Sequence, residues 1–312
     1  MNEFKFRNEC FKNLGYAIDL KNIPPIGKIS RFKDKTKKNH NLDGWIANIN
    51  NNIYKIGSWS NNITFCYIDN NFTFEKVNPE EKKILRNKYK EATFLAEKER
   101  ENRYFLAAQK AETELNSMQN CNNHNDHDYL RIKFISPSFG MKKKGNKIYI
   151  PIFNSYTGKL QSYQSIDNKG NKLFLKEGKK TNGCFPINNN EDFDTIILCE
   201  GLATGATIYR YHQSLEFMNK YYERPYDETK PLVLCCFDAG NLIKVAQSMR
   251  SKYLDMVIEI WADNDANKIG LSKARDVKKS VSNIKIYYPN FTQEDINNGL
   301  SDYNDLVEFK RD

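Results

Sequence analysis

The sequence predicts an α/β protein that contains a four-stranded, mostly parallel sheet flanked by helices. Four short apolar runs in the C-terminal part have the composition of buried strands, and they occupy residues 195–199, 232–237, 257–262 and 284–288. Helical patterns separate these runs, at about 203–214, 240–251 and 269–281. Strands that alternate with helices favour a parallel sheet with right-handed crossovers. The first run stops at a carboxylate, Glu200, which is followed by a glycine and the start of a helix, a strand–turn–helix pattern.

Composition and charge divide the chain into four expected domains. Residues 1–78 are expected to form a small N-terminal β-rich domain, 79–127 a helical connector with a polar loop, 128–192 a basic mixed α+β subdomain, and 193–312 the α/β domain. The net charge of the chain is +9. Residues 128–192 carry twelve basic against five acidic groups, whereas 193–312 carry fifteen against eighteen. A basic part beside an acidic one suits a polyanion held next to cations, although a lysine-rich solvated surface is the simpler alternative.

The composition also indicates a globular protein of a reducing compartment. Charged residues make up 28% of the 312 residues and hydrophobic residues 39%. No apolar run approaches the roughly 18 residues that a membrane helix needs, and the N-terminus lacks the apolar stretch of a secretory signal. The seven cysteines follow no disulfide spacing, so free thiols are expected. We therefore expect a cytoplasmic protein without a membrane partner.

Residues 1–78 alternate apolar and polar side chains, with asparagine pairs at the expected turns. This pattern predicts an antiparallel sheet of about three strands. Aromatic residues beside the basic segment 28–38 could stack on single-stranded nucleic acid, but aromatics that alternate in a small sheet more often form its core. The residues concerned are Trp45, Tyr54, Trp59, Phe65 and Tyr67.

Residues 79–119 have helical periodicity that begins at Pro79 with acids in the first turn. The apolar face changes phase across the charged stretch 97–102, which predicts either a break or one long bent helix. In the loop that follows, Cys121, His124 and His127 are spaced three apart. A zinc site is conceivable there, but no fourth ligand is in sight, so we expect a plain loop and no zinc.

Residues 128–192 are expected to contain strands at 147–153, 160–166 and 173–175, joined by glycine turns. Lysines cluster around these turns. Beside a metal site, such lysines would neutralise a phosphate chain or follow a template backbone. The candidate nucleotide- and DNA-binding residues are Lys142, Lys143, Lys144, Lys147, Lys172, Lys176, Lys179 and Lys180.

Acidic residues follow two of the predicted parallel strands. Glu200 ends the first strand, and Asp263 and Asp265 follow the third, with their side chains on one side of extended chain. Because the carboxyl ends of parallel strands meet at one edge of a sheet, these acids are expected to converge there. Converging carboxylates need cations, and their oxygens suit Mg²⁺ or Mn²⁺, with Asp302 as an outer ligand. The alternative for Glu200 alone is an ordinary capped strand end.

Four short motifs in a fixed order resemble those of Toprim-domain primases encoded by phages and plasmids. They are EGLATG at 200–205, FDAGNL at 237–242, ADND at 262–265 and SDYNDL at 301–306. Upstream, the strands and lysines of 147–180 are similar to the basic subdomain that precedes Toprim in such primases. The resemblance covers roughly 128–309, and more loosely the N-terminal sheet.

This resemblance implies a Toprim-like sheet and metal-dependent synthesis of short RNA primers. The partners it implies are a single-stranded DNA template, ribonucleoside triphosphates and a separate replicative helicase, in the replication or transfer of a mobile element. Glu200, Asp263 and Asp265 would form the catalytic and metal-binding centre, with Glu200 alternatively a general base. Gly201, Thr204, Asp238 and Asn241 would support the motifs.

The chain departs from these primases in one respect that concerns template choice. It has no CxxC pair, so the cysteine-rich zinc ribbon that commonly selects template sites is missing, and it has no P-loop motif of a helicase motor. Two other functions remain open. The same acids could activate water in a nuclease, or the fold could serve as a non-catalytic DNA-binding module.

Overall fold

The computed structural model describes residues 2–33, 35, 42–59, 61, 63–69, 72–73, 77–138, 140–211 and 230–309. The protein has a mixed α/β architecture with more than one sheet, and its backbone packs into two compact units, Met1–Asn102 and Arg103–Asp312. The boundary between the units falls inside one long helix. The four-part division of the chain by composition and charge stays a prediction.

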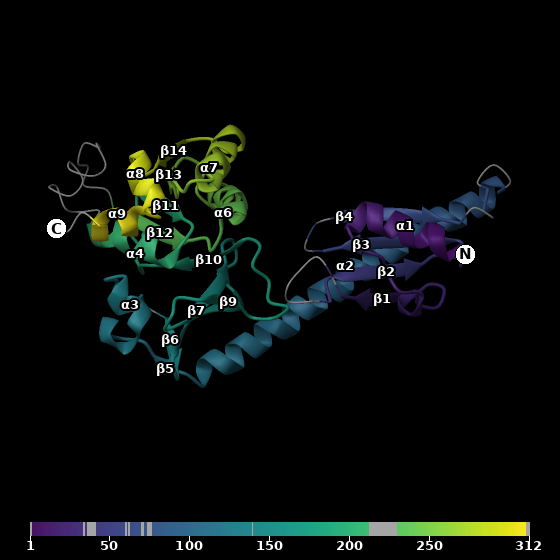
Figure 1. The fold of residues 1–312 in the computed structure, drawn as a ribbon, viewed down its shortest axis with the longest axis horizontal. Coiled ribbons are helices and arrows are strands. Elements are labelled where there is room, and N and C mark those ends of the chain that lie inside the picture. Colours follow the sequence, from purple (N-terminus) through teal and green to yellow (C-terminus); the bar gives the residue numbers. More distant parts are fainter. Residues whose placement is uncertain are drawn as a thin grey trace. The chain divides into compact units, whose positions relative to one another are not determined.

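The first unit is a four-stranded antiparallel sheet between two helices. The strands β1 (Ile29–Phe32), β2 (Gly44–Asn48), β3 (Ile53–Ser58) and β4 (Ile63–Ile68) pair in sequence order (Figure 1), one strand more than the number predicted. The helix α1 (Glu3–Leu14) packs Phe6, Cys10 and Leu14 against one face. A short 3₁₀ helix (Leu20–Asn22) follows α1.

The aromatic residues of this unit mainly form its core. Trp45, Tyr54 and Tyr67 are buried, and Trp59 stacks on Trp45. The interpretation of these three buried rings as a nucleic-acid platform is therefore wrong, because a base cannot reach them. Residues 34 and 36–38 of the adjacent basic segment lie outside the described residues.

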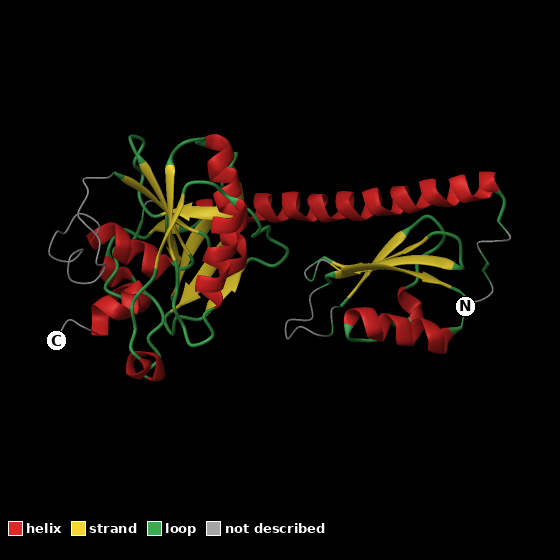
Figure 2. Ribbon diagram, turned by 90° about the horizontal axis from the view of Figure 1, so that it is seen from above, coloured by secondary structure: helices red, strands yellow, loops and turns green. Residues whose placement is uncertain are grey.

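The helix α2 (Pro79–Asn116) runs without a break through the charged stretch 97–102 (Figure 2). Of the two alternatives predicted there, the break is wrong. Ala92 and Ala96 pack into the first unit, whereas Ala107, Ala111 and Leu115 pack into the second. The apolar face changes phase because each end of the helix packs against a different partner.

The second unit is built on a ten-stranded sheet. Its strands are β5 (Gln119–Asn120), β6 (Lys142–Lys144), β7 (Lys147–Asn154), β8 (Leu160–Asp167), β9 (Lys172–Phe174), β10 (Gly183–Pro186), β11 (Thr195–Cys199), β12 (Pro231–Cys235), β13 (Val257–Trp261) and β14 (Ile284–Tyr287). The order along the main path is β14-β13-β11-β12-β10-β7-β6-β5, and β8 pairs with β7 and β9.

The strands β11 to β14 lie within two residues of the predicted ones, and neighbours among them pair in parallel. They do not form a separate sheet. The strand β10 pairs antiparallel with β12 on one side and with β7 on the other. The basic strands and the parallel strands therefore share one continuous sheet, which the sequence pattern did not predict.

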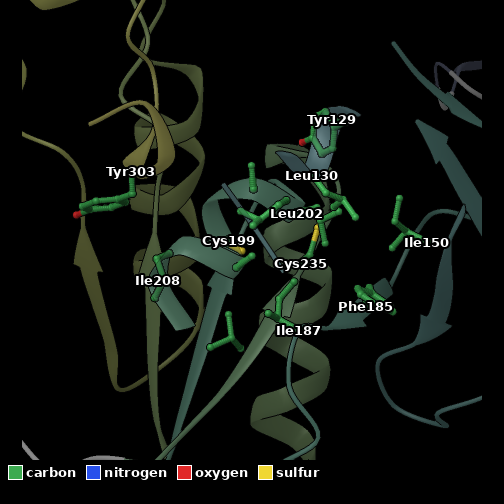
Figure 3. Close-up of a cluster of buried hydrophobic side chains, with 14 of the residues drawn as sticks. Tyr129, Leu130, Ile150, Phe185, Ile187, Cys199, Leu202, Ile208, Cys235 and Tyr303 are labelled. Atoms are coloured by element: carbon green, nitrogen blue, oxygen red, sulfur yellow. The ribbon is translucent and has the colours of Figure 1, made fainter. Parts of the chain in front are cut away.

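Helices cover both faces of the parallel part. The helices α6 (Ala239–Lys252) and α7 (Ile269–Ser280) pack together on one face, and α4 (Leu202–Tyr211) and α9 (Tyr303–Phe309) on the other. The described residues of the unit also contain the short helices α3 (Asp128–Ile132) and α8 (Gln293–Asn297) and a 3₁₀ turn (His124–Asp126). Figure 3 shows the core under α4, where Cys199, Leu202 and Cys235 meet.

The described part of α4 ends at Tyr211, so the end predicted at residue 214 lies outside the described residues. No helix in the described segments is both long and apolar enough to span a membrane.

Candidate functional site

Three carboxylates follow three adjacent parallel strands at the same edge of the sheet. The strand β11 lies between β12 and β13, and its last residue, Cys199, is in register with Cys235 and with Trp261. Glu200 follows β11 directly, while Asp238 and Asp263 lie a few residues beyond the ends of β12 and β13. Parallel pairing therefore brings together side chains that are up to 63 positions apart, as expected for an open α/β sheet.

Glu200 and Asp263 lie side by side around a glycine. Gly270, the second residue of α7, is buried, and a Cβ added to it would overlap Glu200 Oε1 and lie 2.8 Å from the backbone oxygen of Asp263. Gly270 is not among the site residues predicted from the sequence. A glycine in the first turn of an amphipathic helix, where it costs about 1 kcal/mol relative to alanine, was the available signal.

The acids of this edge repel one another in a poorly hydrated site. Burial, followed by repulsion from Asp238 and Asp265, raises the pKa of Glu200 to about 7, against a hydrogen bond from the Ala239 N–H. Burial, followed by repulsion from Glu200 and Asp302, raises the pKa of Asp263 to about 9, and the charge of Lys172 opposes this shift. Both shifts have the cause expected for crowded carboxylates.

Among the described residues of this edge, buried carboxylate oxygens without a hydrogen bond are Glu200 Oε1, Asp263 Oδ1, Asp265 Oδ1 and Asp238 Oδ2, and Asp238 Oδ2 alone of these has an ion pair, with Lys180. The orientation of Asp263 and Asp265 is fixed by the residue between them. The Asn264 N–H donates to the Ser301 carbonyl at 2.8 Å, and Asn264 Nδ2 donates to the Pro289 carbonyl at 2.9 Å. Buried polar atoms are normally satisfied, so unsatisfied carboxylate oxygens call for a partner outside the chain.

The donor set fits a hard divalent cation. Carboxylate oxygens are the ligands that Mg²⁺ and Mn²⁺ prefer, and a cation would relieve both the repulsion and the missing hydrogen bonds. Within the described residues, no group of three or more His, Cys, Asp or Glu side chains is already arranged to hold a metal ion.

Asp302, the predicted outer ligand, is engaged on both oxygens. Its Oδ1 accepts the Asp305 N–H at 2.9 Å, which caps α9, and its Oδ2 accepts the Thr204 hydroxyl at 2.7 Å. Burial raises its pKa. These contacts connect α4 to the start of α9, so Asp302 and Thr204 hold the two helices together. Ligation of a metal ion by Asp302 stays a prediction.

The other motif residues join the parallel strands to the basic part. Asp238 caps α6 by accepting the Asn241 N–H at 2.9 Å, and its Oδ2 lies 2.6 Å from Lys180 Nζ. Asn241 Nδ2 donates to the carbonyls of Gly183 and Cys236, and Asn241 Oδ1 accepts the Asn182 N–H. Gly201 accepts the first backbone hydrogen bond of α4, from the Gly205 N–H at 3.0 Å.

The predicted lysines divide into two groups by their place in the sheet. Two lysines face the acids. The charge of Lys172 opposes the rise in the pKa of Asp263, and Lys180 forms an ion pair with Asp238. The lysines of β6 lie three strands from β12, roughly 14 Å away at 4.8 Å per strand. Lys142 contacts Asn120, and Lys143 forms an ion pair with Asp126. The charge of Lys147 contributes to the lowered pKa of Asp167, and Lys179 lies over the Tyr104 ring. Lys144 and Lys176 are exposed.

Two residues of the conceivable zinc site, His127 and Cys121, have other contacts. His127 caps α3 through Nδ1, which accepts the Tyr129 N–H at 3.2 Å, and its Nε2 is 3.1 Å from the Asn146 carbonyl oxygen. Cys121 is buried in the core.

Comparison with known proteins gives a partial match to DNA primases. Two curated Escherichia coli proteins, both named DNA primase TraC, are 27% and 28% identical to this chain over 172 residues. Each match covers 51% of this chain and only 14% and 11% of the respective relative. The similarity confirms the resemblance to DNA primases that the motifs predicted. No protein-family model matches the chain.

Two solved structures show a weaker likeness. The primase fragment of the bacteriophage T7 primase-helicase protein is 14% identical, with a TM-score of 0.34 over 62% of this chain and 79% of that chain. A chain from a structure of the bacteriophage T7 lagging-strand DNA polymerase interacting with primase domains of two gp4 subunits, bound to an RNA/DNA hybrid and dTTP, is 15% identical, with a TM-score of 0.33 over 53% of this chain and 76% of that chain.

Proposed function

We propose that the chain is a DNA primase-like nucleotidyltransferase, which makes short RNA primers on single-stranded DNA for the replication or transfer of a phage, plasmid or other mobile element. The observation that carries this proposal is the edge where Glu200, Asp263 and Asp265 present unsatisfied carboxylate oxygens next to Lys172. The similarity to DNA primase TraC over 172 residues supports it. The parallel strands β11 to β14 with helices on both faces are consistent with a Toprim-like sheet, which we include in the proposal.

Mg²⁺ or Mn²⁺ would be held by Asp263 and Asp265, with Glu200 beside them. When bound, such a cation stabilises charge on a triphosphate and favours ionisation of an attacking hydroxyl. The chain itself supplies the carboxylates and the contacts that hold them in place. Because the carboxylates are crowded, neutralisation by a cation would relieve their mutual repulsion. Glu200 has a second role open to it, as the base that accepts the hydroxyl proton, because its Oε1 has no other partner.

Basic residues would handle the two polyanions of the reaction. Lys172 and Lys180, next to the acids, suit the phosphates of a ribonucleoside triphosphate. The lysines of β6 lie on the same continuous sheet. Together with the exposed Lys176, in the turn after β9, they suit the backbone of a template strand. A replicative helicase would be a separate partner, and the reaction would take place in the cytoplasm.

Incubation with single-stranded DNA, ribonucleotides and Mg²⁺ or Mn²⁺ tests the proposal. Short RNA products are expected from the unmodified chain, and their loss is expected in Asp263→Asn. Asp276→Asn is the matched control, because Asp276 lies on the exposed side of α7 and pairs only with nearby lysines among the ion pairs found. Shortened DNA would instead indicate a nuclease. Intact DNA that is merely retarded on a gel, with a steep salt dependence, would indicate a binding module.

A further inference from the structure

Two aromatic rings lie at the edge of the sheet that carries the acids. Every residue of β9 is exposed, and Phe174 keeps 38% of its surface accessible. Its ring meets that of Phe237 edge to face, with the centroids 6.1 Å apart and the planes at 74°. Phe237 directly precedes Asp238. Phe237 is half-buried and packs against the core, whereas Phe174 is exposed. An exposed aromatic ring beside a polar site is a common mark of a binding surface.

The backbone of Phe237 is held in an unfavourable conformation. Its φ is +70°, in the left-handed region that bulky side chains rarely adopt. This conformation redirects the chain at the end of β12, where Asp238 then caps α6. Strained residues of this kind concentrate at binding and catalytic sites, where the surrounding structure holds them in place.

Two ammonium groups accompany the rings. Lys180 Nζ lies 5.1 Å from the centroid of the Phe174 ring and 2.6 Å from Asp238 Oδ2. Lys172 is two residues before Phe174 on the same strand, so their side chains share one face and are about 6.6 Å apart along it. The charge of Lys172 acts on Asp263. The Phe174 ring and the two ammonium groups therefore lie together beside the acids.

We propose that Phe174 and Phe237 form a base-stacking subsite for the incoming ribonucleoside triphosphate, with Lys172 and Lys180 facing its phosphates. This inference rests on the proposed function, and it adds where the base binds. Copying a template requires the site to accept every base, and an aromatic face does so because each base presents a π-surface. Lys180 moves from Asp238 toward the phosphates when the nucleotide enters, since both compete for the same ammonium group.

Isothermal titration of the full chain with ATP and, separately, with inorganic tripolyphosphate in Mg²⁺ tests the subsite. Phe174→Ala is expected to weaken ATP binding by about five- to 150-fold, the range for loss of one stacked base, and to change tripolyphosphate binding less than twofold. Phe174→Tyr keeps the ring and should bind ATP like the unmodified chain. Phe174→Leu keeps apolar bulk without the ring, so it should lose ATP affinity even if the alanine variant folds poorly.

Equal loss for both ligands, or no loss for either, would overturn the assignment. So would a loss of affinity for single-stranded DNA with ATP binding unchanged, because the rings would then contact the template. These measurements do not depend on primer synthesis. If the unmodified chain makes no RNA yet Phe174→Ala still discriminates ATP from tripolyphosphate, the proposed function fails and the subsite stands.

Discussion

The carboxylate of Glu200 occupies the space where Gly270 would carry a side chain. The two residues come from different βα units, and Gly270 also lies against the backbone of Asp263. The start of α7 therefore sets how closely the two acids approach each other. Only a residue without a Cβ lets the helix approach this closely.

Gly270→Ala is expected to lower the free energy of unfolding by about 1–3 kcal/mol and to abolish metal-dependent activity. Overpacking of a tight site outweighs the roughly 1 kcal/mol that alanine gains in a helix. Urea unfolding and primer synthesis measure the two effects. Ser272→Ala, at an exposed position of the same helix, is the control and should be neutral or slightly stabilising. An active, more stable Gly270→Ala would show that the acids need no such close approach.

Without metal, the stability of the chain should fall as the pH rises. The pKa of Asp263 is about 9 in the folded protein, so near pH 7 the folded state keeps a proton that the unfolded state has released. The unfolded state then binds fewer protons, and stability decreases with pH between about 4 and 9. Glu200, with a pKa of about 7, adds to this decrease between its ordinary value and 7.

Asp263→Asn should remove most of that dependence and stabilise the metal-free chain at pH 8 by roughly 1–3 kcal/mol. Urea unfolding in EDTA at pH 5 and pH 8 measures it, with Asp276→Asn as the unaffected control. Mg²⁺ should stabilise the unmodified chain and not Asp263→Asn, because only the folded site with its carboxylate binds the ion. Parallel pH profiles for the two chains would contradict the repulsion argument.

Thr204→Val should destabilise the chain by about 1–3 kcal/mol. Thr204 is fully buried, and its hydroxyl is the donor to Asp302 Oδ2. The isosteric valine leaves that buried carboxylate oxygen without a partner. Thr204→Ser keeps the hydrogen-bond donor and should lose less stability, because it removes only the packing of the methyl group. Chemical unfolding of the three proteins ranks them, and valine matching serine would show that the hydrogen bond contributes nothing.

Lysines at different places in the sheet should have separable effects on primer synthesis. Lys172→Met is expected to raise the KM for ribonucleotides several-fold, because Lys172 faces the acids. Lys144→Met, on β6 and exposed, should leave that KM unchanged, weaken single-stranded DNA binding and reduce the slope of log affinity against log salt by about 0.7. If both variants change the same parameter, one basic surface serves both polyanions.

The amino-acid sequence by itself determined the strands β11 to β14 and the helices between them, because a buried strand and an amphipathic helix leave periodic patterns in a short window. It also predicted that Glu200, Asp263 and Asp265 converge at one edge, since parallel strands place their carboxyl ends together. The order of motifs indicated a DNA primase, and the relatives confirm that resemblance.

The tertiary structure alone decided how those residues are used. In the structure, β10 joins the basic strands to the parallel ones. The oxygens of Asp302 accept hydrogen bonds from Thr204 and from the first turn of α9, and Gly270 lies against Glu200. The structure also brings Phe174 to Phe237, 63 positions away. Each of these is a contact between distant segments. No local pattern encodes such contacts, because they depend on how whole elements pack and on which partners remain for each polar atom.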